Sequence, residues 1–303
     1  MKNCLAAIVL FAVVAVVSAM ETTVKKYMPD SAVVAAEINV AALLRNPAVQ
    51  EMLNQPEYSA RRQKYEEKSG VQLTDLKTVW FFVDGFGQRV GLFFLNKPAD
   101  LENVFKKAEL QYRKLTIKGQ TVFRVSAKEH GEKSAEIAEL APGILVSGEK
   151  GSVVRYLKGK RGNAEALSSV LKKIPAGEAV KVAFINTIKN ATGAVEDPVQ
   201  VWMSFNFSGK EQRNLAFQSR FVCGSIEGVK MFAARFPMYI MMGSALLFNQ
   251  APELGEQVVG CIKKRIEKSD YLVNAVIPEQ LGKQISAYLE KHANRLMLHQ
   301  KGF

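Results

Sequence analysis

The chain has 303 residues, of which 41 are Lys or Arg, 29 are Asp or Glu and 48% are hydrophobic. This length suggests about two domains, and the composition excludes disordered, collagen-like and low-complexity chains. Three cysteines are too few for a disulfide-framework protein or for a zinc site with four thiolates. The net charge of +12 is spread along the sequence in small clusters.

The N-terminus has the features of a secretory signal peptide. Lys2 provides a positive charge, residues 5–17 form an uncharged apolar run, and Val17, Ser18 and Ala19 place small residues before a cleavage site. The run is about thirteen residues long, shorter than the roughly 20 that a membrane-spanning helix needs. We expect cleavage after Ala19, which leaves a chain without a transmembrane span, either periplasmic or secreted.

The rest of the sequence contains an internal similarity. Residues 32–39 and 179–186 are identical at five of eight positions. The two tryptophans, Trp80 and Trp202, follow in strand-like segments. After each tryptophan come a second strand, a helix containing phenylalanine, and a closing strand and helix.

We therefore predict two related units, residues 20–162 and 163–303, after a signal peptide of residues 1–19. The predicted class is α+β, with the order strand, helix, hairpin, helix, strand, helix in each unit. Antiparallel-rich sheets of ferredoxin-like order would pack against helices. An extra hairpin is predicted at residues 112–125, in the first unit only.

One long helical segment is predicted early in the first unit. It covers residues 40–68, with breaks at Pro47 and Pro56 and an end at Gly70.

A signal peptide followed by two α+β units in this order resembles secreted bacterial two-repeat α+β proteins of unknown function. The resemblance covers the mature chain and rests on architecture. It implies no catalytic residue.

The sequence contains no motif of a known reaction. Residues 143–152 have the glycine spacing of a phosphate-binding loop, but Glu149 stands where that loop requires lysine. The histidines, His130, His292 and His299, do not cluster as metal ligands do. We therefore expect neither a cofactor nor a metal site.

Three glutamates have a spacing typical of one helix face. Glu132, Glu136 and Glu139 follow the i, i+4, i+7 pattern, with Lys133 between them. The pattern predicts a solvated charged face of a helix rather than a pair of catalytic carboxylates.

Two cysteines, Cys223 and Cys261, remain after cleavage. In an oxidising compartment they could form one disulfide. The alternative is two buried thiols, because Cys223 ends an apolar strand and Cys261 is predicted on an amphipathic helix. In that helix Lys263, Lys264 and Arg265 would lie on the solvent side.

The segment from residue 231 to 248 is rich in methionine, and its last eleven residues, 238–248, are uncharged and apolar around the whole circumference of a predicted helix. Such a helix is usually buried in the core, but its methionines also suit a pocket for an apolar ligand or an interface. The candidate residues are Met231, Phe232, Met238, Tyr239, Met241, Met242 and Phe248.

The function that these features favour is a non-catalytic, exported binding or structural module of the cell envelope. A carrier of an apolar or amphipathic ligand and a hydrolase with an unrecognised site are the alternatives. The positive charge favours an anionic envelope polymer, lipid headgroups or another envelope protein as partner. Nucleic acid is not expected, because no aromatic residues alternate with the basic clusters.

Overall fold

The computed structural model describes residues 24–127, 134–162, 164–175, 178–186 and 198–299. The chain divides into two compact units, residues 1–187 and residues 188–303. The division lies after Thr187, whereas the sequence predicted a boundary after residue 162. The segment between the two positions contributes a helix and a strand to the first unit. The predicted signal peptide lies outside the described residues.

The first unit contains an antiparallel sheet, so the α+β class is correct. Its strands lie in the order β8-β1-β2-β3-β7-β6-β5-β4, and each paired neighbour runs antiparallel. The strands are β1 (Ala32–Ile38), β2 (Leu76–Asp84), β3 (Arg89–Leu95), β4 (Leu110–Ile117), β5 (Gln120–Ala127), β6 (Ser134–Ala141), β7 (Ile144–Glu149) and β8 (Val180–Ile185).

One face of this sheet is the core of the first unit. A single row across six strands is almost completely inaccessible to solvent: Glu37, Trp80, Leu92, Val146, Ala138 and Val122. Two helices, α7 (Ser152–Lys158) and α8 (Glu165–Leu171), cover the sheet with buried valine, leucine and tyrosine side chains. Burial of these apolar side chains is the main stabilising contribution to the unit.

Two ion pairs lie within this core. Lys181 on β8 is 3.5 Å from Glu37 on β1, and both side chains are at least 96% buried. Arg124 on β5 contacts Glu136 on β6 at 2.6 Å, and the Glu136 side chain is completely buried. Buried charges are tolerated because each lies beside an opposite charge.

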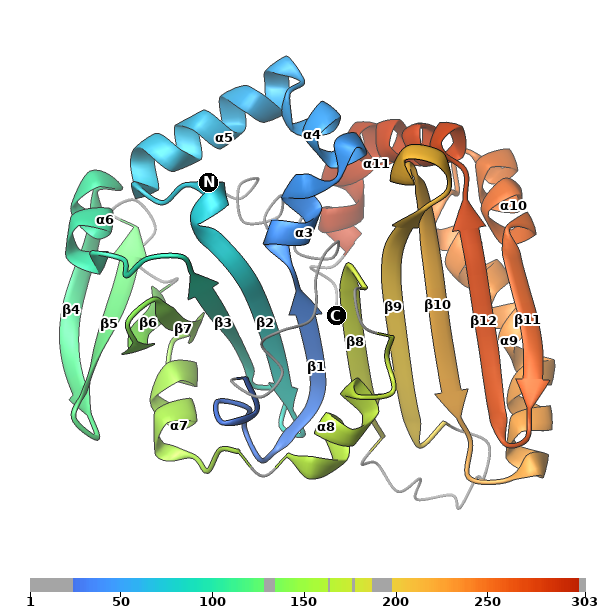
Figure 1. Cartoon of the computed structure of the whole chain (residues 1–303), viewed down its shortest axis with the longest axis horizontal. Helices are drawn as coiled ribbons and strands as arrows, with labels where there is room; N and C mark the ends of the chain where they lie inside the picture. Colours follow the sequence, from blue (N-terminus) through green and yellow to red (C-terminus); the bar gives the residue numbers. More distant parts are fainter. Residues whose placement is uncertain (1–23, 128–133, 163, 176–177, 187–197, 300–303) are drawn as a thin grey trace. The chain divides into compact units, whose positions relative to one another are not determined.

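The predicted helical segment at residues 40–68 is confirmed, including its two breaks. It forms α3 (Val40–Arg45), α4 (Pro47–Leu53) and α5 (Pro56–Ser69), which Figure 1 shows in blue. Each proline occupies the first turn of its helix, where the absent N–H costs no hydrogen bond. Gly70 ends α5 with a φ of 65°, a conformation that glycine adopts without strain. The short η1 (Leu73–Asp75) follows.

The opposite face of the sheet is covered in part by α6 (Leu101–Lys107). Its Phe105 packs against Phe123 and Val125 on β5. The predicted extra hairpin is confirmed as β4 and β5, which are joined by a turn at Lys118 and Gly119.

The second unit contains four described strands in the order β11-β12-β10-β9, again antiparallel. They are β9 (Gln200–Ser208), β10 (Asn214–Val222), β11 (Ile262–Glu267) and β12 (Asp270–Ile277), with the short η2 (Lys210–Gln212) between the first two. The helices are α9 (Ile226–Leu247), α10 (Pro252–Gly260) and α11 (Glu279–His299). In Figure 1, α9 lies behind β11 and β12.

The ferredoxin-like strand order is wrong. In that split βαβ motif the third strand lies between the first and the second strand, whereas β1 pairs directly with β2 and β3 lies beyond β2. The connection through α3, α4 and α5 brings the chain back beside β1, so β1 and β2 pair directly in opposite directions. The repeating order of elements therefore produces a sheet of meandering strands.

The helix predicted for the glutamates at 132–139 is also wrong. Residues 134–141 form β6, and Glu136 points into the core instead of solvent. A strand places alternate residues on one face, so Glu136 shares the buried face with Ala138. Glu132 lies outside the described residues.

Candidate binding surface

Helix α9 begins at a side-chain cap. The Ser225 hydroxyl accepts a hydrogen bond from the Gly228 backbone N–H at 2.9 Å, which satisfies one of the free donors of the first turn. The helix continues through Pro237 and ends at Phe248. The sequence prediction of a helix over residues 231–248 is thus correct, although the helix starts earlier.

One face of α9 packs against the sheet of the second unit. Phe232 and Phe236 contact Phe221 on β10 and Tyr271 on β12, with ring centroids 4.9–5.6 Å apart. Val229 is completely buried beside them. Burial raises the pKa of the Tyr271 hydroxyl. This aromatic cluster fixes the rotation of α9 about its axis and so determines which residues point outward.

The outward side of α9 is apolar as well. We call it the apolar stripe and define it as the exposed large side chains Met231, Met238, Tyr239, Met241, Met242, Leu246 and Leu247. Their exposed fractions range from 42% to 72%. The sequence has no charged residue between Arg235 and Glu253. Exposed apolar patches of this kind mark interaction sites.

The expectation that this helix is core is therefore only half right. Phe232 and Phe248 are buried, whereas the other five candidate residues, Met231, Met238, Tyr239, Met241 and Met242, are exposed. A helix that is apolar on all sides is expected to be buried on all sides. In the described part of the chain, only the side of α9 that faces the sheet is covered. Leu246 and Leu247 belong to the stripe and were missed, although they continue the same apolar run.

Helix α10 holds the C-terminal end of α9 in place. A Cβ atom added at Gly255 would lie 2.4 Å from Ser244 Oγ and 3.3 Å from Phe248 Cβ, so any larger residue would require these neighbours to shift. On α11, the Tyr288 ring lies 5.4 Å from that of Phe248. The stripe is thus carried by a helix that other elements pack against along its length.

Positive charges lie around the first half of α9. Lys230 and Arg235 are exposed on the helix. Lys264 on β11 is opposite Val273, which belongs to the cluster under α9, so Lys264 lies on the α9 side of the sheet. Ile266 shares that side and is 48% exposed. Negative side chains also occur, Glu227 at the first turn of α9 and Glu253 and Glu256 on α10.

The prediction of a helix around Cys261 is wrong beyond Gly260. Cys261 caps α10, and Lys263, Lys264 and Arg265 follow on β11. β11 is the edge strand of its sheet, and charged side chains on such an edge protect it from pairing with other chains.

The two cysteines are too far apart for the disulfide that the sequence allowed. The Cys223 N–H donates a hydrogen bond to the Ser269 carbonyl, beside the start of β12, whereas Cys261 precedes Ile262, which is opposite Ala275. Ser269 and Ala275 are six residues apart along the strand, which corresponds to about 20 Å. A disulfide requires Cα atoms within about 7 Å. The structure accordingly has no disulfide between Cys223 and Cys261.

We predict two different thiol reactivities. Cys223 is 2% exposed within the aromatic cluster, whereas Cys261 is partly exposed. In the folded, non-reduced protein, iodoacetamide is expected to modify Cys261 at least about tenfold faster than Cys223. Peptide mass spectrometry measures both rates. A Cys223–Cys261 disulfide peptide would contradict this arrangement. Equal modification rates of the two cysteines in native buffer, with the same rates after unfolding in urea, would contradict it as well.

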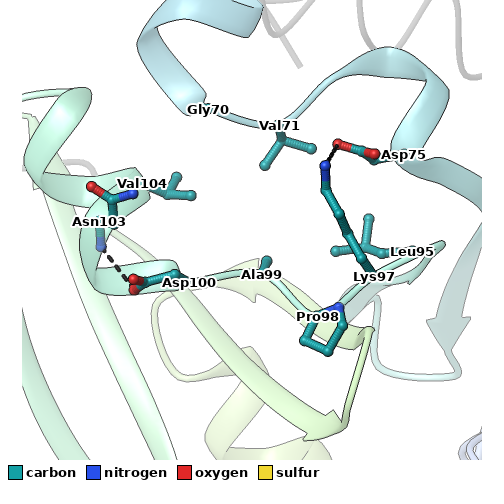
Figure 2. A pocket seen from close by; sticks show the side chains of 10 residues that line it. All are labelled: Gly70, Val71, Asp75, Leu95, Lys97, Pro98, Ala99, Asp100, Asn103 and Val104. Carbon is teal, nitrogen blue, oxygen red and sulfur yellow. Dashed lines mark hydrogen bonds and ion pairs between the residues drawn. The ribbon is translucent and has the colours of Figure 1, made fainter.

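Two small pockets lie in the first unit. One has a volume of about 170 Å³ and is lined by Val71, Leu95 and Val104, with the Lys97–Asp75 ion pair at one side (Figure 2). The second, of about 210 Å³, lies beside Asp84 and Tyr156. Sites for organic ligands usually measure about 300–1,000 Å³. Neither pocket includes a residue of the apolar stripe.

The other residues considered as metal ligands or as a phosphate-binding loop form no such site among the described residues. Within the described ranges, no group of three or more His, Cys, Asp or Glu side chains could hold a metal ion. His130 lies outside the described residues. The glycine-containing segment at residues 143–152 consists of strand β7 and the short turn that leads into α7, and Glu136 accepts a hydrogen bond from Val154 N–H in the first turn of α7. No helix in the described part of the chain is long and apolar enough to cross a membrane.

Comparisons with known proteins leave the function open. No model of a protein family matches the sequence, and no curated protein matches it. Among solved structures, a similarity is found to crystal form I of TP0453, with 12% identity over 91% of this chain and 98% of that chain and a TM-score of 0.41.

Proposed function

We propose that this protein is an exported, non-catalytic binding module of the cell envelope, and that the apolar stripe on α9 is its binding surface. The observation that carries the proposal is the exposure of seven large apolar side chains on one structured helix. Exposing them to water is unfavourable, and covering them by a partner releases that free energy. Methionine supports such a role because its flexible side chain adapts to irregular apolar partners.

The structure offers less support for the two alternatives. A carrier needs a cavity that encloses its ligand, and the two pockets in the first unit are small and contain no stripe residue. A hydrolase needs a nucleophile beside a base. Cys261 is followed on the edge strand by Lys263, Lys264 and Arg265, and none of these is the histidine that most often serves as the base.

We also infer that the chain contains two repeats that arose by duplication, as the sequence similarity between the β1 and β8 segments suggested. The order β2-β3-β7-β6 has a counterpart in β9-β10-β12-β11. In both, a helix follows the second strand and the last strand of the set pairs with the second. Trp80 on β2 and Trp202 on β9 have equivalent places in this scheme. The hairpin of β4 and β5 would then be an insertion in the first unit.

The test of the binding surface is a charge-introducing variant of the stripe. We expect Met241→Glu/Leu246→Glu to lower the retention of the mature chain on isolated envelope from the source cells by at least about tenfold, because each glutamate would have to be desolvated at the interface. Both positions are exposed, at 67% and 72%, so the fold should tolerate the change. Co-sedimentation with the envelope fraction measures retention.

The matched control is Val276→Glu. Val276 is 51% exposed and lies on β12, on the sheet face opposite the aromatic cluster that holds α9. This control should bind as the unmodified chain does. Equal retention of all three proteins, with unchanged circular dichroism, would contradict the proposal that the stripe binds.

A further inference from the structure

We propose that the partner of the apolar stripe is the surface of an anionic lipid bilayer, and that α9 lies in the plane of the headgroup region. This inference rests on the proposed function, because it names the partner of the same surface. Three features of α9 support it: its apolar circumference, the width of the stripe, and the position of the nearby cations.

The first feature is that α9 is apolar on two opposite sides. Val229, Phe232 and Phe236 face the sheet, whereas Met231, Met238 and Met242 point away from it. A helix that is apolar on all sides is stable in an environment that is apolar on all sides. The sheet supplies one side of that environment, and a second apolar medium must supply the other.

The second feature is the width of the stripe. Met241 and Leu246 are five positions apart, which places them about 140° apart around the helix axis. A second α9 helix packed along the stripe, as in a dimer of this chain, would contact a narrower seam. It would leave one of the two side chains in water. A fluid bilayer surrounds the exposed half of a helix and covers both.

The third feature is the distribution of charge. Lys230 and Arg235 are exposed in the first half of α9, before the uncharged run that carries most of the stripe. Lys264 extends from the edge strand on the same side of the sheet. Cations beside an apolar helix face can contact lipid phosphates while the apolar side chains enter the acyl boundary. Of the acidic residues near the helix, Glu227 lies in its first turn, and Glu253 and Glu256 lie beyond the uncharged run, on α10.

The experiment is vesicle flotation of the mature chain, residues 20–303. The probes are vesicles of phosphatidylcholine alone and vesicles with about one-third phosphatidylglycerol. We expect binding to the anionic vesicles, weaker binding to the neutral ones, and a decrease when NaCl rises from about 0.05 M to about 0.5 M.

Three variants separate the contributions. Met241→Glu/Leu246→Glu should weaken binding to anionic vesicles by at least about tenfold, and Val276→Glu should leave it unchanged. Lys230→Gln/Arg235→Gln should weaken binding to anionic vesicles by about tenfold and binding to neutral vesicles by much less. Circular dichroism and thermal unfolding confirm that each variant folds.

The outcomes distinguish this inference from the function on which it rests. One outcome is that the protein does not bind vesicles while its retention on the envelope fraction still depends on the stripe. In that case the lipid surface is not the partner, and the proposal that the stripe is a binding surface is retained. A stripe-dependent dimer in sedimentation velocity, without vesicle binding, would also overturn the lipid inference. Loss of both dependences would overturn both proposals, and equal binding to neutral and anionic vesicles would overturn the anionic preference.

Discussion

Replacement of Trp80 by alanine is expected to lower the free energy of unfolding of the first unit by about 3–5 kcal/mol. Trp80 is 1% exposed, stacks on Phe82 at 5.9 Å between ring centroids, and lies opposite the fully buried Leu92. The substitution removes a large apolar side chain from the centre of the sheet and leaves a cavity that these neighbours cannot fill.

The same loss is expected for Trp202→Ala in the second unit, where Trp202 is 7% exposed. Urea unfolding followed by circular dichroism measures both variants, since removing a tryptophan changes the fluorescence signal itself. The control is Phe86→Ala, because Phe86 is 94% exposed at the β2–β3 turn and should have almost no effect. A near-neutral Trp80→Ala or Trp202→Ala would contradict the equivalence of the two positions.

A milder substitution tests what the indole N–H contributes. The Nε1 atoms of Trp80 and Trp202 are buried with no hydrogen-bond partner among the described residues. An unsatisfied buried donor is unfavourable, so Trp80→Phe removes a cost along with part of the apolar volume. It should therefore destabilise the unit by less than half as much as Trp80→Ala.

Glu136→Ala is the second substitution with a large expected effect, about 3–5 kcal/mol. Glu136 Oε1 accepts hydrogen bonds from Arg124 Nε at 3.1 Å and from Arg124 Nη2 at 2.6 Å, while Oε2 accepts one from Val154 N–H at 3.2 Å. The variant leaves a guanidinium with 18% exposure unpaired and removes an acceptor at the start of α7. Thermal and urea unfolding measure the loss.

Two comparisons show whether the loss comes from the unpaired charge. Arg124→Met/Glu136→Leu replaces both partners with apolar side chains and should recover most of the stability. Glu102→Ala removes the carboxylate of the exposed Lys114–Glu102 pair and should have a small effect. If the double variant is as unstable as Glu136→Ala, the loss comes from packing and the ionic explanation is wrong.

The contribution of Glu136 should depend on pH. Burial raises the pKa of its carboxyl, but hydrogen bonds from Arg124 and from backbone N–H groups outweigh burial and lower that pKa below its ordinary value of 4.5. A lowered pKa stabilises the folded state fully above the pKa of the unfolded chain, and the stabilisation is lost as pH falls through the folded-state value. The difference in stability between the unmodified protein and Glu136→Gln should therefore shrink as pH falls below about 4.

Local signals in the sequence were sufficient for much of the fold. Pro47 and Pro56 predicted the breaks between α3, α4 and α5, because proline fits the first turn of a helix and disfavours continuation of the preceding helix. The turn at Lys118 and Gly119 predicted the hairpin of β4 and β5. The apolar run at residues 231–248 correctly predicted a helix, because the run is longer than a buried strand and is rich in methionine and alanine.

Other elements could not be predicted because their pattern is ambiguous without a partner. Glu136 and Glu139 fit the spacing of a helix face, whereas Glu136 and Ala138 fit the alternation of a strand. The decision depends on Arg124, which lies on the adjacent strand at the level of Glu136. β11 was missed because an edge strand with Lys263, Lys264 and Arg265 has no apolar alternation to indicate it.

For the candidate surface, the sequence determined the composition and the helix, and the tertiary structure decided the exposure. Residues 236–252 carry no charge, which the sequence alone shows, and such a run predicts an apolar environment on every side. Only the packing of Phe232 and Phe236 on the sheet of the second unit decides which half of α9 is covered. Burial is a property of the neighbours that long-range contacts bring together, so the exposed stripe could be recognised only after the strands had been placed.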